Sequence, residues 1–176
     1  MKRTHFLKTL FLFLCTAFLS MAGFAQNAPA SPPAKATGKI GDANITIDYS
    51  APSVKGRKIF GGLEAYGKTW RAGANRATTL ETDKAITVEG KSLPAGKYSL
   101  FLTPGENEWT VILNSETGQW GIKRGGEANR DPAKDVLTAT VKPVKSATLT
   151  EQLAYKVDNN GVTMQWENVE VPISIK

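Results

Sequence analysis

Three residues whose side chains suit ligand binding lie within six positions of one another, at Trp70, Arg71 and Asn75. A tryptophan ring can stack on a ligand, an arginine can bind a carboxylate or carbonyl group, and an asparagine can orient a polar group. The alternative is structural, because a long irregular segment packed on a sheet needs polar side chains that bond its carbonyl groups. That requirement favours the structural role, and both interpretations stay open.

Two further positions extend the candidate site. Arg57 lies between Lys55 and Lys58, and this basic cluster is typical of a solvated patch or of an anion-binding surface. Trp120 lies among glycines in a long loop, where an exposed ring could stack on a sugar or an aromatic ligand, or could close the end of the sheet. The predicted ligand-binding residues are therefore Arg57, Trp70, Arg71, Asn75 and Trp120.

The residues that most often serve as nucleophiles or zinc ligands are confined to the beginning of the chain. The sequence has one histidine and one cysteine, His5 and Cys15. If the first 25 residues are removed, the remaining chain has no histidine and no cysteine. It can then form no disulfide, thiolate nucleophile, Ser-His-Asp triad or zinc site built on His or Cys. We expect no metal, no cofactor and a binding function in preference to catalysis.

A carboxylate-dependent hydrolase that acts on glycans is the enzymatic alternative, because it needs only two acidic side chains about 5–10 Å apart. The candidate acidic residues are Glu64, Glu81, Asp83, Glu106, Glu108, Glu116, Glu127, Asp131 and Asp135. Four of these share one loop and could hold Ca²⁺, although their spacing is not that of an EF-hand. The run Gly62 to Thr69 matches a phosphate-binding loop, but no helix pattern follows it, so we reject nucleotide binding.

The first 25 residues have the pattern of a secretory signal peptide. Three basic residues lie in the first eight positions, an apolar run covers 6–24, and Gly23-Phe24-Ala25 places small residues at the cleavage site. We therefore expect a periplasmic or secreted protein with no membrane span after cleavage. Cleavage leaves 19 basic and 16 acidic residues, a net charge of +3, without a basic run. These numbers argue against a nucleic-acid partner.

The elements that must position these residues are strands. Residues 26–38 are rich in alanine and proline and predict a flexible or partly extended tether. Residues 39–176 suit one domain, in which apolar and polar residues alternate with a period of two. The alternating stretches are 45–49, 77–81, 85–88, 98–103, 109–114, 149–157, 162–167 and 169–175. They predict an all-β fold, an antiparallel β-sandwich or jelly roll, with long irregular loops at 50–79 and 114–135 and a clear hairpin at 158–161.

Several runs resemble a bacterial family known as domain of unknown function 2911. The runs are residues 49–63 (YSAPSVKGRKIFGGL), 70–78 (WRAGANRAT), 93–101 (LPAGKYSLF) and 104–111 (PGENEWTV). The resemblance covers nearly the whole chain after the signal peptide and implies an exported protein, without supplying a mechanism. We expect a module that binds a small molecule, a glycan or an envelope protein, with a purely structural envelope role as a further alternative.

Overall fold

The computed structural model describes residues 29–176, which form strands and one short 3-10 helix. The elements in order are β1 (Pro33–Ile40), β2 (Ala43–Ser50), β3 (Thr78–Thr82), β4 (Ile86–Val88), β5 (Lys91–Leu93), β6 (Gly96–Thr103), β7 (Trp109–Asn114), η1 (Pro132–Lys134), β8 (Asp135–Val141), β9 (Val144–Asp158) and β10 (Gly161–Ser174). No helix in this part of the chain is long and apolar enough to cross a membrane. The predicted signal peptide lies outside the described residues.

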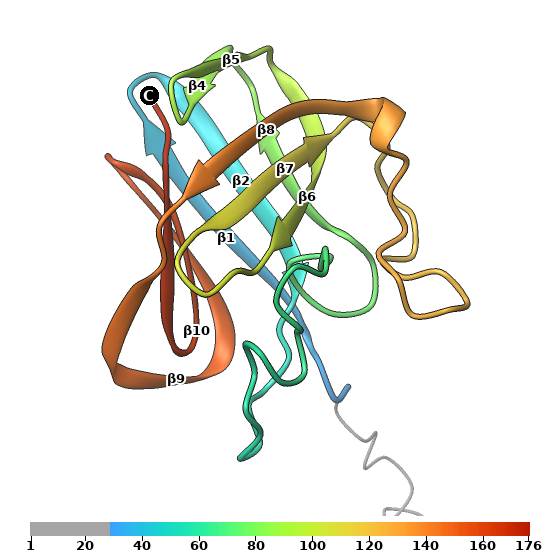
Figure 1. Ribbon diagram of the computed structural model, residues 1–176. Helices are drawn as coiled ribbons and strands as arrows, with labels where there is room; N and C mark the ends of the chain where they lie inside the picture. The colour runs from blue at the N-terminus through green and yellow to red at the C-terminus, as the bar shows by residue number, and fades with distance from the viewer. Residues whose placement is uncertain (1–28) are drawn as a thin grey trace, which may run out of the picture.

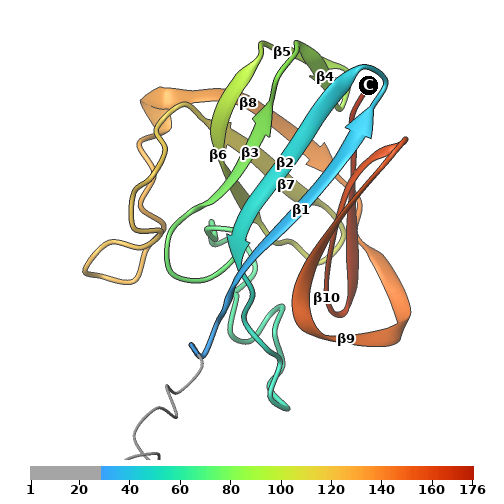
Figure 2. The same ribbon diagram turned by 180° about the vertical axis from the view of Figure 1, so that it is seen from behind.

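Six strands form one antiparallel sheet in the order β1-β2-β3-β6-β7-β8. The long hairpin β9–β10 lies against the β1 side of this sheet, and the short hairpin β4–β5 lies at the opposite end from the irregular segment between β2 and β3 (Figures 1 and 2). The expected antiparallel β-sandwich is confirmed, with the large sheet as one layer and the long hairpin as the other.

The period of two explains where the core lies. In β6, Leu100 and Leu102 point into the main core between the sheet and the hairpin, where they join β10 residues such as Met164. Phe101 points to the other face and forms a small second cluster with Ala77 and Ile112. Ala128 of the second long loop packs against that cluster. Both faces of the central strands are therefore buried, and each long loop is tied to the sheet.

The prediction of a tether over residues 26–38 is wrong for residues 33–38, which belong to β1. Pro33 pairs with Ser50 at one end of the β1–β2 ladder. The side chains that face inward here are small, and a Cβ on Gly38 would overlap Val157 of β9. Because β9 packs so closely, only small residues fit, and this composition is also typical of a linker.

The hairpin predicted at Asp158–Gly161 is confirmed. Asp158 pairs with Gly161, and the Asp158 side chain accepts a hydrogen bond from the backbone N–H of Asn160 at 2.8 Å. The two alternating stretches that follow form the single strand β10, with register shifts between Gln165 and Val169. The left-handed backbone of Glu167, at φ 56°, lies within this irregularity, so the two stretches remain one strand with a local bulge.

Candidate functional site

Trp70 anchors the first irregular segment in the core. Its backbone exchanges hydrogen bonds with Leu102 at 2.7 and 2.9 Å, and its indole N–H donates to the carbonyl of Gly73 at 2.9 Å. The ring stacks on Trp166 with centroids 5.5 Å apart and is only 3% exposed. The expectation that Trp70 forms a stacking surface for a ligand is therefore wrong, because protein atoms already cover the ring.

The chain on both sides of Arg71 is held by tertiary hydrogen bonds. Ala72 has a left-handed backbone, at φ 54°, and its carbonyl accepts hydrogen bonds from the hydroxyls of Thr78 at 2.9 Å and Tyr155 at 2.8 Å. Burial raises the pKa of Tyr155 well above its ordinary value, so this phenol keeps its proton and donates. These bonds set the direction in which the neighbouring Arg71 side chain leaves the segment.

Asn75 has the structural role that the sequence analysis kept open. Its side-chain amide donates a hydrogen bond to the backbone carbonyl of Ser31 at 3.3 Å. Its backbone carbonyl accepts a hydrogen bond from the backbone N–H of Gly121 at 3.0 Å. Its backbone is left-handed, at φ 59°, a conformation that asparagine tolerates better than most residues. Asn75 therefore joins the N-terminal residues, the first irregular segment and the second long loop, and it does not line the pocket described next.

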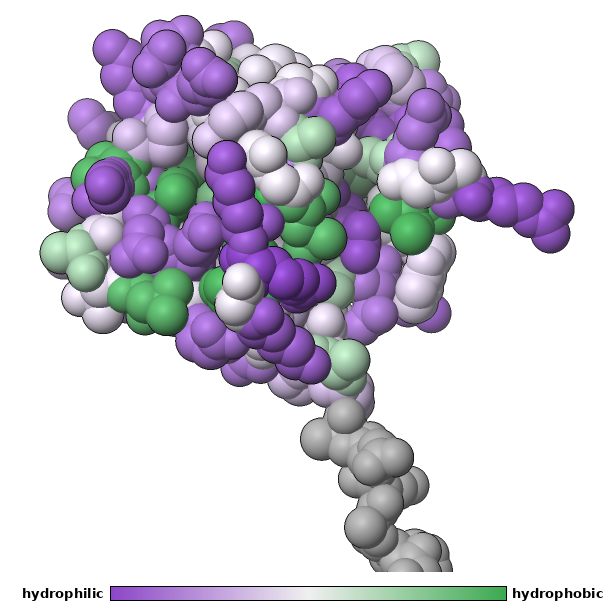
Figure 3. Space-filling model, turned by 60° about the horizontal axis from the view of Figure 1, so that its bottom comes forward, coloured by the Kyte–Doolittle hydropathy of each residue, from purple (hydrophilic) through white to green (hydrophobic). Residues whose placement is uncertain are grey.

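A pocket of about 420 Å³ lies where the first irregular segment, the second long loop and β10 meet. The side chains that give it chemical character are Lys55, Arg57, Glu64, Arg71 and Trp166. Figure 3 shows the lower end of the molecule, where hydrophilic side chains surround smaller hydrophobic areas. The structure thus brings together Arg57 and Arg71 of the predicted set and adds Glu64 and Trp166, which the sequence analysis did not assign to the site.

Arg57 is oriented by its own turn. Its Nε donates to the carbonyl of Val54 at 3.0 Å, and its Nη2 donates to the carbonyl of Ser53 at 2.6 Å. These two bonds hold the plane of an otherwise exposed guanidinium at the pocket wall. An arginine held in one orientation loses little side-chain entropy when it binds a ligand.

Two buried donors at this pocket lack an acceptor among the described residues. They are Nε of the half-buried Arg71 and Nε1 of Trp166, whose side chain is fully buried. Leaving a buried donor without a partner costs on the order of 1–3 kcal/mol, so native proteins rarely do so without a reason. Both residues line the pocket, which makes it the candidate ligand site.

Glu64 is the carboxyl group of the pocket, and burial raises its pKa from 4.5 to about 7. Arg71 and Arg57 oppose this increase by stabilising the charged form. The backbone of Glu64 is held in a turn, in which its N–H donates to Ile59 and its carbonyl accepts from Gly61, both at 2.9 Å. Burial also lowers the pKa of Arg71, but an arginine keeps its charge near neutral pH. The pocket therefore contains fixed cations and one carboxyl that titrates near neutrality, a combination that is common at functional sites.

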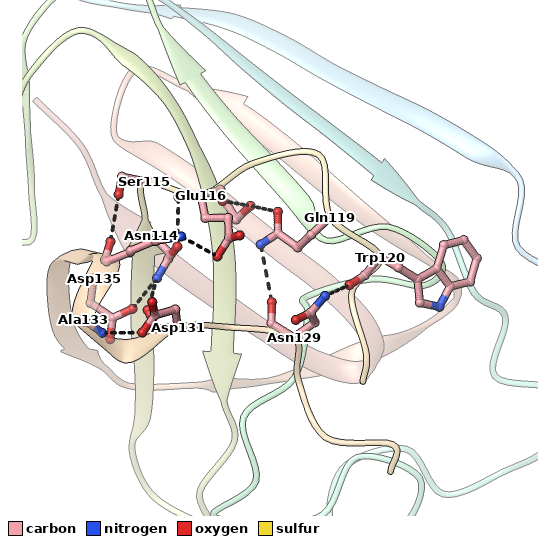
Figure 4. Close-up of polar contacts among 11 residues, drawn as sticks. Asn114, Ser115, Glu116, Gln119, Trp120, Asn129, Asp131, Ala133 and Asp135 are labelled. Carbon is pink, nitrogen blue, oxygen red and sulfur yellow. Dashed lines mark hydrogen bonds and ion pairs between the residues drawn. The ribbon is translucent and has the colours of Figure 1, made fainter. Parts of the chain in front are cut away.

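The second long loop is built on the fully buried Asn114, as Figure 4 shows. The Asn114 amide donates to the carbonyl of Asp131 and to the carboxylate of Asp135, both at 2.8 Å, and its side-chain oxygen accepts the backbone N–H of Glu116 at 3.0 Å. Asp135 also forms an ion pair with Arg130 at 3.2 Å. The Asp135 carboxylate therefore helps to hold the loop together. Residues 29–176 contain no cluster of three or more acidic, His or Cys side chains suited to a metal.

Trp120 lies on this loop, but away from the pocket. Its carbonyl accepts a hydrogen bond from the Asn129 side chain at 2.9 Å, while its ring points away from the polar network (Figure 4). The side chain is 54% exposed and does not line the pocket that contains Arg57 and Arg71. Of the next two residues of the loop, Gly121 lies against the side chain of Arg71, and Ile122 lines the pocket. A ligand contact by Trp120 stays a prediction.

A wider groove of about 750 Å³ adjoins the pocket, and Leu63, Glu64 and Gly126 line both. Other side chains along it are Lys68, Lys123, Glu127 and Arg130. Lys68 belongs to the run that matches a phosphate-binding loop, but an isolated bridge at Trp70 and a bend follow it in place of a helix. The helix that a phosphate-binding loop requires is therefore missing after this segment.

The fold and the pocket define an antiparallel β-sandwich with a cationic pocket at one end. A family model described as "Protein of unknown function (DUF2911)" matches residues 31–175. The chain belongs to this family, as its sequence motifs predict. No curated protein and no solved structure matches the chain.

Proposed function

We propose that this protein binds a small anionic ligand, with a carboxylate or phosphate group, in the pocket of Arg57 and Arg71. The observation that carries the proposal is the pair of buried donors without acceptors, Nε of Arg71 and Nε1 of Trp166. Both residues line the same pocket as the oriented guanidinium of Arg57, and the oxygens of an anionic group are strong acceptors for such donors. Hydrogen bonds to charged groups are about twice as strong as neutral ones, which suits recognition by few contacts.

The charges at the pocket support an anion in preference to a neutral ligand. Three cationic side chains, Lys55, Arg57 and Arg71, face one carboxyl group, Glu64. When Glu64 is protonated, it no longer repels an anion and can donate a further hydrogen bond. When it is ionised, the pocket still carries more positive than negative charge.

We further propose that the protein acts in the periplasm or outside the cell. The support is the signal-peptide pattern of residues 1–25, with its basic start, apolar run and small-residue cleavage site. An exported binding protein meets its ligand outside the cytoplasm, so nutrients, cell-wall fragments and other envelope components are the relevant sources of acidic groups.

The test uses thermal unfolding of residues 26–176, which contain every described residue, with acetate, phosphate, acidic sugars and cell-wall fragments as probes. A ligand at about one hundred times its Kd adds about 2.7 kcal/mol to the free energy of unfolding. We expect acidic probes to raise Tm in the native protein, and we expect Arg71→Met and Arg57→Gln to remove this increase. Lys58→Met is the matched control, because Lys58 is exposed in the same segment and does not line the pocket.

A flat response to every acidic probe would contradict the proposal and favour the purely structural envelope module. An equal loss of stabilisation in Lys58→Met would also contradict it, because net charge would then explain the binding. Each variant is also compared without ligand, so that a change in folding is separated from a change in binding.

One observation favours a second candidate function, a hydrolase that acts on glycans. Glu64 and Glu127 line the same groove, and the pKa of Glu64 near 7 suits a general acid. Glu127 is exposed and would serve as the second carboxylate that such an enzyme needs. The test is release of reducing ends from glycans, with Glu64→Gln and Glu127→Gln as the expected inactive variants and Glu106→Gln, in an exposed turn, as the control. Activity retained in both groove variants would rule out this candidate.

A further inference from the structure

The groove beside the Arg57–Arg71 pocket has its own cationic side chains. Lys68 comes from the first irregular segment, and Lys123 comes from the second long loop. Arg130 lines the groove as well, but its charge is paired with Asp135 at 3.2 Å. Glu127 offsets part of the lysine charge. The two lysines therefore supply the positive charge that remains available to a ligand.

The groove also contains a buried donor. Nε of Arg130 lacks a hydrogen-bond partner among the described residues, while its Nη2 holds Asp135. The Arg130 side chain is only 18% exposed, so its position is set by packing. Arg130 thus resembles Arg71, since each lines a pocket and has a buried Nε without a partner among the described residues.

The two pockets adjoin each other. Leu63, Glu64 and Gly126 line both of them, so one molecule can contact residues of both. Gly126 contributes no side chain to this boundary, and its left-handed backbone, at φ 86°, favours glycine there. The boundary between the pockets is therefore formed by the backbone of Gly126 and by the residues Leu63 and Glu64.

We propose that the ligand carries two anionic groups joined by a spacer, one bound by Arg57 and Arg71 and the other by Lys68 and Lys123. This inference rests on the proposed function, because the first group occupies the pocket assigned there. Joining two weakly bound groups makes the second binding step intramolecular, and the gain in affinity depends on a spacer that matches the distance between the sites. The second group needs no bidentate partner, since lysines bind oxyanions as point charges.

The experiment compares monoanions with dianions by calorimetric titration of residues 26–176. Here a monoanion is a ligand with one anionic group, acetate or phosphate. A dianion is a ligand with an anionic group at each end, a linear dicarboxylate with about two to six methylene groups, pyrophosphate or tripolyphosphate. We expect a dianion of one spacer length to bind tighter than the monoanion by on the order of 100-fold. The better series, carboxylate or phosphate, identifies the source of the anionic groups.

The variant Lys68→Met/Lys123→Met separates the two sites. We expect this variant to bind the dianion no tighter than the monoanion, and to bind the monoanion with the affinity of the native protein. The control is Lys58→Met/Arg124→Met, which removes the same charge from the same two segments at positions that line neither pocket. This control is expected to keep the dianion gain.

The outcomes distinguish the two proposals. If monoanions bind and no dianion binds tighter, the two-site inference is wrong and the proposed function stands. If the lysine variant weakens monoanions and dianions equally, the lysines do not form a second site, and the inference is again wrong. If no anion binds the native protein, the proposed function fails, and the two-site inference fails with it.

Discussion

The backbone of Gly121 lies directly against the side chain of Arg71. A Cβ at Gly121 would overlap Cδ of Arg71 and would lie 2.9 Å from both the Arg71 Cβ and the carbonyl oxygen of Asn75. Real Cβ atoms do not approach other atoms so closely, and the backbone carbonyl cannot move aside cheaply. The second long loop thus confines the arginine of the first irregular segment, and only glycine permits this arrangement.

The first prediction concerns this contact. Gly121→Ala should lower the free energy of unfolding by about 1–3 kcal/mol, because an extra methyl group in a tightly packed place forces neighbouring atoms to move. It should also weaken anion binding, since Arg71 must shift. Chemical denaturation and titration with phosphate measure the two effects.

Gly125→Ala is the control for Gly121→Ala. A Cβ at Gly125 would contact nothing within 4 Å, so this variant should change the free energy of unfolding by no more than about 0.5 kcal/mol. Equal stability of the two variants would show that Gly121 does not confine Arg71.

The second prediction uses the titration of Glu64. Below pH 4.5 its carboxyl is protonated in the folded and unfolded states; between pH 4.5 and about 7 only the unfolded state releases the proton. The free energy of unfolding should therefore fall as the pH rises through this range, by up to about 3 kcal/mol from this group. Glu64→Gln should remove this fall. The free energy of unfolding of the variant, relative to that of the native protein, should therefore increase as the pH is raised from 4 to 8. Parallel pH profiles of the two proteins would contradict the pKa near 7.

The third prediction links the same carboxyl to binding. Loss of its proton places a negative charge in the Arg57–Arg71 pocket, so acetate should bind more weakly above about pH 7 than below it. The other charged groups that line the pocket and the groove are Lys55, Arg57, Lys68, Arg71, Lys123, Glu127 and Arg130. With acetate, whose own charge is constant over pH 6–8, the affinity of Glu64→Gln should not change across this range. A drop of equal size in the variant would assign the pH dependence to another group.

The fourth prediction concerns the hydrogen bond from Tyr155 to the carbonyl of Ala72. Tyr155→Phe should lower the free energy of unfolding by about 1 kcal/mol, a typical value for one hydrogen bond, because Thr78 still bonds the same carbonyl. Tyr66→Phe, at an exposed tyrosine, should have no measurable effect. Thermal unfolding of the two variants provides the comparison, and equal Tm values would show that the Tyr155 bond adds nothing to stability.

The fifth prediction separates the two tryptophans that the sequence analysis treated alike. Trp70→Ala should cost about 3–5 kcal/mol, because it removes a buried ring from the core. Trp120→Ala should change stability by no more than about 0.5 kcal/mol. If Trp120 contacts a ligand that extends beyond the pocket, its replacement should weaken binding of that ligand without affecting folding. Unchanged binding of every ligand found would remove Trp120 from the site.

The sequence by itself determined the all-β class, because the alternation of apolar and polar residues is a local property of each strand. It also determined the turn at Asp158–Gly161, where the local preference for an asparagine-glycine turn decides the structure. The confinement of His5 and Cys15 to the predicted signal peptide limits the chemistry available to the remainder. None of these conclusions requires knowledge of which segments meet in space.

The tertiary structure decided the rest. The strand order, the burial of Trp70 and the inclusion of residues 33–38 in β1 depend on contacts between segments far apart in the sequence. The sequence predicts half of the site: it assigns Arg57 and Arg71 to ligand binding, but it offers Glu64 only as one of nine candidate acids and does not indicate Trp166. The carboxyl of Glu64 acquires a pKa of about 7, and the indole N–H of Trp166 lacks an acceptor, because distant parts of the chain exclude water from them. The local sequence does not show which distant parts of the chain will do so.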